Sequence, residues 1–323
     1  GREARFAVEE ARAEVAMLAG AHPADVVFTS GGTEANNLAL SKFDNIFTSA
    51  IEHDSILHAA PGATVINVDS SGIIDLGHLR QHLNALSPES RTNTLVSIMM
   101  ANNETGVIQP IQRIVEMARS AGVAVHSDIV QMLGKTHLDF TATGLDYASL
   151  SAHKIGGPTG IGALLVRPGN RMTSLLRGGG QEQGRRSGTE NFLGIIGFGA
   201  AARAAFYGVS HYKAMAEWRD AFEARILKQR DDAVIFSLAA PRLTNTSSIA
   251  VGNKPSDVMV MALDLAGIAA SAGSACSSGK VHESHALKAM GAGEHAARAV
   301  RISGGWQTQE SDFEKLAEVL VAL

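Results

Sequence analysis

Cysteine is almost absent from this sequence, since Cys276 is the only one in 323 residues. The chain can form no internal disulfide, which excludes a disulfide-stapled secreted fold and favours a reducing compartment such as the cytoplasm. A metal site built from several cysteines is excluded as well. Because a lone cysteine is usually a small buried hydrophobe, only its neighbours can indicate whether Cys276 is reactive.

The sequence also lacks a strong charge of one sign and any long apolar run. Its 28 Lys and Arg residues against 32 Asp and Glu residues give a net charge of −4, which argues against a broad nucleic-acid-binding surface. No apolar run approaches the roughly 20 residues of a membrane-spanning helix, so we expect neither nucleic acid nor a membrane as a partner. The chain starts at Gly1 with a charged helical pattern and no signal segment. That start is typical of a trimmed chain, so an organellar address on the natural N-terminus is left open.

What is present is enough apolar material for a large core. Hydrophobic residues make up 45% of the chain and charged residues 19%, which is typical of a globular protein, and the length suits two domains. Short runs rich in β-branched residues alternate with helical patterns, which predicts a mostly parallel sheet with helices on both faces. The expected strands are 26–29, 64–68, 94–99, 123–126, 147–150 and 161–166, and the expected helices include 2–19, 34–42, 111–121 and 192–207.

Two domains are expected from the change of pattern along the chain. Residues 1–208 form the large α/β domain, and residues 209–323 form a smaller α+β domain that carries Cys276. Ligands of parallel sheets bind at the carboxyl ends of the strands. The motifs that directly follow the predicted strands are therefore where we look for chemistry.

The first such motif is SGGTEANN at residues 30–37. Glycines at a strand-to-helix turn let the backbone approach a ligand closely, and the free N–H groups of a helix start favour an anion such as phosphate. Gly32 and Thr33 are the candidates here. The alternative is a plain turn in which Thr33 caps the helix.

The second motif is SAHKIGGPTGIG at residues 151–162. Lysine is normally solvated at the surface, but in a desolvated pocket its pKa falls and it becomes a nucleophile able to form a Schiff base. Lys154, just past a buried strand, is the candidate. The spacings of a Walker phosphate loop and of a dinucleotide-binding turn are both absent.

Three further motifs are weaker when taken alone. Asp128 lies just past a strand and could face a ring nitrogen that must stay protonated, but an N-cap is the more common role. His53, in EHDS, could stack on an aromatic cofactor or transfer protons, although a helix-start histidine is more often structural. Asn103, in NNETG, follows another strand, where Asn and Gly also form simple turns.

The surroundings of Cys276 are small and polar, SAGSACSSGK at residues 271–280. A core cysteine would sit among large apolar neighbours, which this segment lacks. We therefore expect Cys276 to lie exposed on a loop, and to be reactive if its thiolate is stabilised.

Taken together and in order, these motifs resemble the cysteine desulfurases of the NifS/IscS type, members of the class V aminotransferase family of fold-type I enzymes that depend on pyridoxal 5'-phosphate (PLP). The matching segments run from about residue 28 to residue 303 and cover most of the chain. They are FTSGGTEANN, EHDS, NNETGVIQPI, HSDIVQ, SAHKIGGPTGIGAL, GGGQEQGRRSGTEN, SAGSACSSGK and RAVRIS.

The resemblance implies a role for each matched residue. Lys154 would bind PLP covalently, Asp128 would pair with its ring nitrogen, Gln131 would hydrogen-bond its phenolic oxygen, and His53 would stack on the ring. The phosphate would be held by Gly32, Thr33, Ser151 and His153, and by Thr189 reaching across from the partner subunit of a homodimer. Asn103 would contact cofactor or substrate, and Arg301 would bind the substrate carboxylate, which a guanidinium fork suits.

The implied reaction removes sulfur from L-cysteine. It leaves L-alanine and a persulfide on Cys276, and a mobile loop would deliver that sulfur to an acceptor or scaffold protein of iron–sulfur cluster assembly or tRNA thiolation. Two alternatives are kept. One is a selenocysteine lyase or related PLP β-lyase, and the other is a non-catalytic sulfur-relay or scaffold-binding paralogue.

Three departures from the family pattern stand out. An N-terminal segment of the family is missing, and Gly304 follows Ser303 where the family usually has leucine, which predicts looser packing. His282 and His285 suggest a metal pair, but two histidines without carboxylates make a poor site. We expect them at the surface, and we expect no bound metal.

Overall fold

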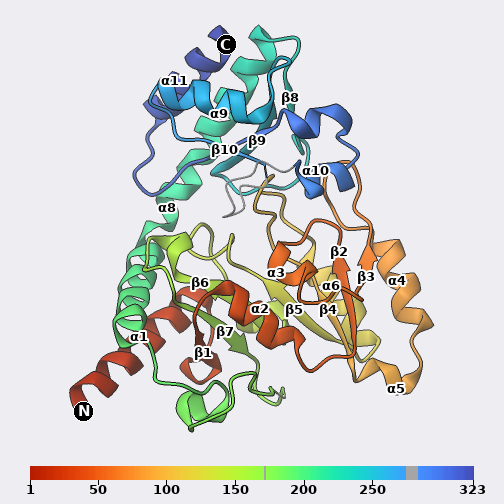
Figure 1. The fold of residues 1–323 in the computed structure, drawn as a ribbon, viewed down its shortest axis with the longest axis vertical. Coiled ribbons are helices and arrows are strands. Elements are labelled where there is room, and N and C mark those ends of the chain that lie inside the picture. Colours follow the sequence, from red (N-terminus) through yellow and green to blue (C-terminus); the bar gives the residue numbers. More distant parts are fainter. Residues whose placement is uncertain (171, 274–282) are drawn as a thin grey trace. The chain divides into compact units, whose positions relative to one another are not determined.

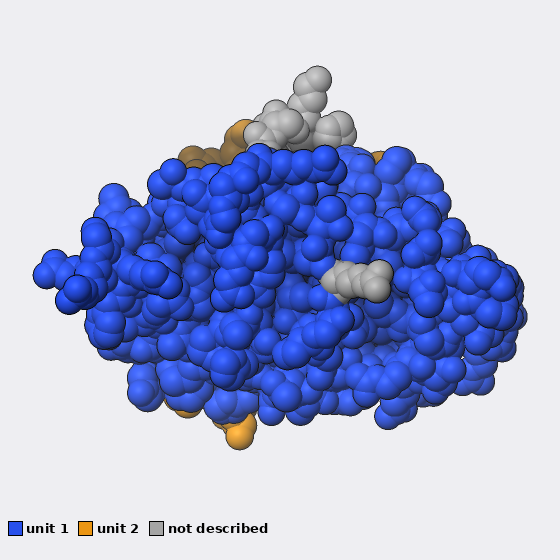
Figure 2. Space-filling view, turned by 90° about the horizontal axis from the view of Figure 1, so that it is seen from below, with its two compact units in different colours: residues 1–66, 75–100, 109–209 blue, residues 67–74, 101–108, 210–323 orange. Residues whose placement is uncertain are grey.

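The computed structural model describes residues 1–170, 172–273 and 283–323, and these form two compact units. Unit 1 contains residues 1–66, 75–100 and 109–209, and unit 2 contains residues 67–74, 101–108 and 210–323 (Figure 2). The boundary expected after residue 208 lies one residue from the end of unit 1. Segments 67–74 and 101–108, which the sequence places in the large domain, belong to unit 2, because segments this short carry no periodicity that could assign them.

Unit 1 is built on a seven-stranded sheet in the order β1-β7-β6-β5-β4-β2-β3 (Figure 1). The strands β2 to β6 pair in parallel with their neighbours, whereas β7 is antiparallel to both β1 and β6. The mostly parallel sheet expected from the sequence is therefore confirmed. In chain order the strands are β1 Val26–Thr29, β2 Asn45–Ser49, β3 Thr64–Ile66, β4 Thr94–Ser97, β5 Ala124–Asp128, β6 Tyr147–Ser151 and β7 Gly162–Val166.

Among the strands of unit 1, β2 is the one that the sequence analysis missed. It is short and its first residue, Asn45, is exposed, so its sequence NIFTS shows no clear apolar run. Its place in the sheet comes from parallel pairing with β3 and β4 on either side. Tertiary pairing of this kind overrides a weak local propensity.

Helices cover the sheet of unit 1. The helix α2 buries Ala35, Leu38 and Leu40 in an apolar cluster with strand residues that include Val27 and Leu164. The α-helices are α1 Arg2–Ala19, α2 Gly32–Leu40, α3 Asp54–Leu57, α4 Leu76–Ala85, α5 Pro88–Arg91, α6 Ile111–Ser120, α7 Phe140–Thr143 and the first part of α8, and the 3₁₀ helices are η1 Pro23–Asp25, η2 Ala152–Ile155 and η3 Gln181–Gly184.

The helix α8, Phe192–Gln229, is much longer than the expected 192–207 and belongs to both units. Its first half lies beside α1, where Arg203 pairs with Glu14. Gly199 permits this approach, because a Cβ there would lie 2.6 Å from Cα of Ala11. By length and composition alone α8 could cross a membrane, although 33% of its most apolar window is buried within the protein. Long core helices pass the same test, so this is weak support for a membrane span.

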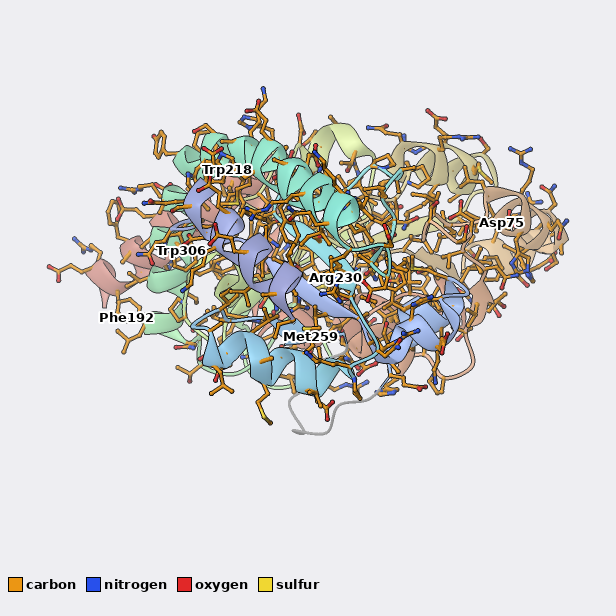
Figure 3. All side chains as sticks on the ribbon, turned by 90° about the horizontal axis from the view of Figure 1, so that it is seen from above. Asp75, Phe192, Trp218, Arg230, Met259 and Trp306 are labelled. Atoms are coloured by element: carbon orange, nitrogen blue, oxygen red, sulfur yellow. The ribbon has the colours of Figure 1, made fainter. Side chains whose placement is uncertain are left out.

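Unit 2 contains a four-stranded antiparallel sheet in the order β10-β11-β9-β8. Its apolar core packs Phe222 and Ile226 of α8 against Met259 and Phe313. Arg230, which is labelled with Met259 in Figure 3, donates hydrogen bonds to the carbonyl oxygens of Leu320 and Val321. Its elements after α8 are β8 Val234–Ile235, β9 Thr246–Ala250, α9 Ser256–Leu265, β10 Ser271–Ala272, α10 His285–Ala289, η4 Gly293–Ala297, β11 Val300–Ser303 and α11 Glu310–Ala322.

The packing around Gly304 differs from what the sequence suggests. A Cβ at Gly304 would lie 2.9 Å from Sδ of Met215. Met215 therefore fills the space beside the glycine, and the looser packing expected from the lost leucine is not found at this position.

Candidate active site

The turn before α2 leaves the start of the helix without a side-chain cap. The N-cap of α2 is Gly31, without a side-chain cap, and the backbone N–H of Ser30 donates to Oε2 of Glu34 at 2.7 Å. Thr33 is an exposed second residue of the helix, so the alternative of a turn capped by Thr33 is wrong. Uncapped N–H groups at the start of a nine-residue helix suit a phosphate.

A glycine in β7 brings this turn against the end of β6. A Cβ on Gly162 would lie 2.7 Å from Cα of Gly31 and 2.5 Å from the carbonyl oxygen of Leu150. A Cβ on Gly32 would lie 3.6 Å from Cβ of Ser151. The first two sequence motifs therefore meet, because their small residues let the two backbones approach closely.

The segment after β6 holds Ser151, His153 and Lys154 at this meeting point. The hydroxyl of Ser151, which is buried, lies 2.8 Å from Nδ1 of His153. Partial burial and the nearby charge of Lys154 both lower the pKa of His153. Lys154 lies in η2 and is exposed. The desolvated pocket expected around this lysine is thus not formed by the described residues.

Asp128 ends β5 and is 7% exposed. Its Oδ2 accepts a hydrogen bond of 2.8 Å from Nδ2 of Asn36, and its Oδ1 accepts one of 3.0 Å from the backbone N–H of Val130. Residues 130–135 form turns instead of a helix, so the alternative of an N-cap is wrong. In the described part of the chain no cation pairs with Asp128, which leaves its carboxylate open to a cationic ligand.

His53 caps α3, the structural role that is more common for a helix-start histidine. Its Nδ1 accepts a hydrogen bond of 3.1 Å from the backbone N–H of Ser55 and lies 2.8 Å from the Ser55 hydroxyl. The ring is exposed. Capping fixes Nδ1 as an acceptor, and it leaves the exposed ring in one orientation.

The structure places Gln131 in the turn after Asp128 and Thr189 beside a surface pocket. The Oε1 of Gln131, in the turn after Asp128, accepts a hydrogen bond of 2.8 Å from Nζ of Lys135. Thr189 is exposed and lines a pocket of about 590 Å³ together with Val8 and Phe192. None of the other predicted site residues lines the described wall of that pocket.

Asn103 and Arg301 both belong to unit 2. Arg301 donates from Nη1 to the carbonyl oxygen of Asn103 at 3.0 Å and from Nη2 to the Ser271 hydroxyl at 3.3 Å. Burial lowers the pKa of Arg301, and the charge of Glu104 opposes that shift. The structure thus brings together the two residues expected to bind substrate, within one unit.

Comparisons with known proteins agree with these motifs over the whole chain. Residues 1–316 match the model of the aminotransferase class-V family. A cysteine desulfurase of Cereibacter sphaeroides is 40% identical over 337 residues, covering 99% of this chain and 85% of the relative. The X-ray structure of a NifS-like protein from Rickettsia africae superposes with a TM-score of 0.90 at 37% identity, covering 99% of this chain and 88% of that one. A structure described as SspA in complex with cysteine gives a TM-score of 0.76 at 33% identity, covering 94% and 87%.

The chain belongs to the cysteine desulfurases of the class-V aminotransferase family. The family resemblance, the fold-type I architecture and the dependence on PLP that were expected from the sequence are confirmed. The roles of individual residues stay predictions. Cys276, together with the rest of 274–282, lies outside the described residues.

This cysteine desulfurase contains residues that the sequence analysis did not single out. Glu34 accepts from Nε of Arg186 at 2.9 Å, which ties the α2 turn to the glycine-rich loop. Asn36 and Ser55 contact Asp128 and His53. All four lie inside quoted motifs, so the signal was present, but their partners are distant in sequence.

Glu52 is a further buried group beside the site. It accepts hydrogen bonds from the Ser49 hydroxyl at 2.5 Å and from the backbone N–H of Met99 at 2.9 and 3.0 Å. Burial, to which the charge of Asp128 adds, raises the pKa of Glu52 to about 8. Burial therefore favours the neutral form of the carboxyl that precedes His53 in sequence.

Proposed function

We propose that this cysteine desulfurase uses Lys154 and Asp128 as the two fixed points of its PLP site. The observation that carries the proposal is Asp128, a buried carboxylate held by two neutral donors and by no described cation. Asp128 would pair with the protonated ring nitrogen of PLP, and bound PLP would supply an electron sink for an amino acid attached to it.

The phosphate end of PLP fits the meeting point of α2 and β6. The N–H groups of Gly32 and Thr33, the hydroxyl of Ser151 and the ring of His153 supply donors there. A side chain at position 162 would clash with Gly31 and push the turn away from the end of β6. In this proposal His53 would stack on the ring, and Gln131 would hydrogen-bond its phenolic oxygen.

Lys154 acts as the base in the proposed reaction, and Arg301 with Asn103 holds the carboxylate of L-cysteine. Cys276 as thiolate attacks the sulfur of the substrate, so that an S–S bond forms and the C–S bond breaks. The carbon fragment keeps the bonding electrons, is protonated and leaves as L-alanine. The sum is L-cysteine and a Cys276 thiol giving L-alanine and a Cys276 persulfide.

The test measures alanine and sulfide from L-cysteine with a reductant, beside L-selenocysteine. We expect both products from L-cysteine, and we expect the Cys276→Ala variant to bind PLP but to release no sulfide. Sulfide release that survives this substitution rules out Cys276 as the acceptor. Turnover of selenocysteine alone identifies a selenocysteine lyase instead.

A homodimer completes the proposal. Thr189 faces a pocket lined by α1 and the start of α8, and these two helices also expose Phe6, Leu193 and Tyr207 at 65%, 78% and 73%. A second copy would cover such side chains and would take Thr189 to its own phosphate site. In mixtures of Lys154→Ala and Thr189→Ala chains, mixed dimers hold one intact site, so activity should return on mixing. Two inactive variants that stay inactive in proven mixed dimers contradict this arrangement.

The persulfide needs an acceptor, since the chain has no second thiol. We propose a cytoplasmic sulfur-acceptor or scaffold protein of iron–sulfur cluster assembly or tRNA thiolation. A reducing compartment would keep the Cys276 thiol free between turnovers. Radiolabelled sulfur from L-cysteine should pass from Cys276 to such a protein in a cytoplasmic extract.

A further inference from the structure

Asn36 connects two residues of the proposed site. Its side chain is 1% exposed, and its Nδ2 donates to Oδ2 of Asp128 and to the hydroxyl of Ser55, both at 2.8 Å. The Ser55 hydroxyl lies 2.8 Å from Nδ1 of His53. Asp128 of β5 and His53 at the start of α3 are therefore the two ends of one hydrogen-bonded chain, within unit 1 (Figure 1).

The charge of Asp128 fixes the direction of every hydrogen bond in this Asp128–Asn36–Ser55–His53 series. A carboxylate only accepts, so the amide of Asn36 must turn Nδ2 toward it. The second hydrogen on Nδ2 then goes to the oxygen of Ser55, whose own hydrogen is left for Nδ1 of His53. Because the backbone N–H of Ser55 also donates to Nδ1 at 3.1 Å, neutral His53 carries its proton on Nε2.

The remaining atom of the amide argues against a purely structural role. Oδ1 of Asn36 is buried and accepts no hydrogen bond from the described residues. A buried acceptor without a partner is destabilising. A leucine of similar size would bury no unpaired acceptor, whereas only a side chain with N–H donors can hydrogen-bond to both Asp128 and Ser55.

We propose that Asn36 is a positioning residue, which holds the Asp128 carboxylate in place for the cofactor ring nitrogen and links it through Ser55 to His53. This inference rests on the roles proposed above for Asp128 and His53. It assigns to Asn36 and Ser55 no contact with substrate. Their substitution should act on the binding and spectrum of PLP before any turnover.

The experiment titrates apoprotein with PLP and records the dissociation constant and the visible circular dichroism of bound PLP. Loss of a hydrogen bond to a charged group predicts binding about 10- to 100-fold weaker for Asn36→Leu. Loss of a neutral bond predicts binding about 2- to 10-fold weaker for Ser55→Ala. The double variant should bind no more weakly than Asn36→Leu, because both substitutions break the same chain.

Asn37→Ala is the matched control, because Asn37 lies next along α2 and, among the described residues, its side chain bonds only to the carbonyl of Thr33 within that helix. It should bind PLP like the wild type. Asn36→Leu with wild-type affinity and dichroism, or losses that add in the double variant, would overturn the inference. If Asn36→Leu does not fold, Ser55→Ala alone provides the test. A PLP dissociation constant and a circular dichroism equal to those of the wild type would then overturn the inference. A wild-type protein that binds no PLP contradicts the proposed function instead, and is recognised before any variant is made.

Discussion

Two buried carboxylates, Asp128 in unit 1 and Glu223 in unit 2, are bound in opposite ways. In unit 2, Glu223 is bound by both ends of the Arg242 guanidinium at 2.7 Å and by the Ser247 hydroxyl at 2.6 Å, so its charge is balanced inside the protein. In unit 1, Asp128 is bound by an amide and a backbone N–H and by no described cation. The first carboxylate serves the fold. Because a buried unbalanced charge is costly until a cation arrives, we propose that the second carboxylate serves a cationic ligand.

The largest effect is expected where the balanced pair is broken. Replacing Glu223 by leucine leaves Arg242 buried without its partner and should lower the free energy of unfolding by about 3–5 kcal/mol. The double variant Glu223→Leu, Arg242→Leu should recover most of that loss. Urea unfolding of the apoprotein measures both, and a double variant as unstable as the single one contradicts the assignment.

Glu52 gives a pH-dependent test beside Asp128. Because its pKa is raised from 4.5 to about 8, the folded state favours the neutral carboxyl. The stability that it contributes is complete below pH 4.5 and is lost as the pH rises to about 8. Relative to Glu52→Gln, the wild type should lose roughly 4 kcal/mol of unfolding free energy over that range. A difference that stays constant from pH 5 to pH 8 would show that Glu52 is ionised throughout.

Asp128 should behave differently from Glu223. Asp128→Asn removes an unbalanced charge, so the apoprotein should keep its unfolding free energy to within about 1 kcal/mol. Its affinity for PLP should fall about 10- to 100-fold, as expected for the loss of a charge-assisted bond. Urea unfolding measures the stability and PLP titration measures the affinity, so both are carried out on the same preparation. A large loss of apoprotein stability would place Asp128 with Glu223 as a structural carboxylate.

A last, modest effect concerns the glycine that brings the α2 turn to β7. An alanine at Gly162 would place its Cβ 2.5 Å from the Leu150 carbonyl oxygen, so the turn must shift. We expect a loss of about 1–3 kcal/mol in unfolding free energy and weaker PLP binding. Gly62→Ala is the control, since a Cβ there meets nothing within 4 Å. Equal behaviour of the two variants would contradict the close approach.

Local sequence could predict where the functional residues lie along the chain, but it could not predict their hydrogen-bond partners. The strands before the motifs and the positions of Lys154 and Asp128 follow from apolar runs that end in polar residues. The pairing of Asn36 with Asp128 joins α2 to β5, and no periodicity records it. The exposed side chain of Lys154 and the strand β2 were missed for a related reason, since each depends on neighbours that are remote in sequence.

The most direct test is alanine formation from L-cysteine, measured per PLP-loaded molecule for the wild type, Asp128→Asn and Glu223→Gln. If Asp128 holds its charge for the cofactor, its variant should turn over about 100-fold more slowly or worse, while folded Glu223→Gln protein should turn over like the wild type. Comparable turnover of Asp128→Asn and the wild type would contradict the account.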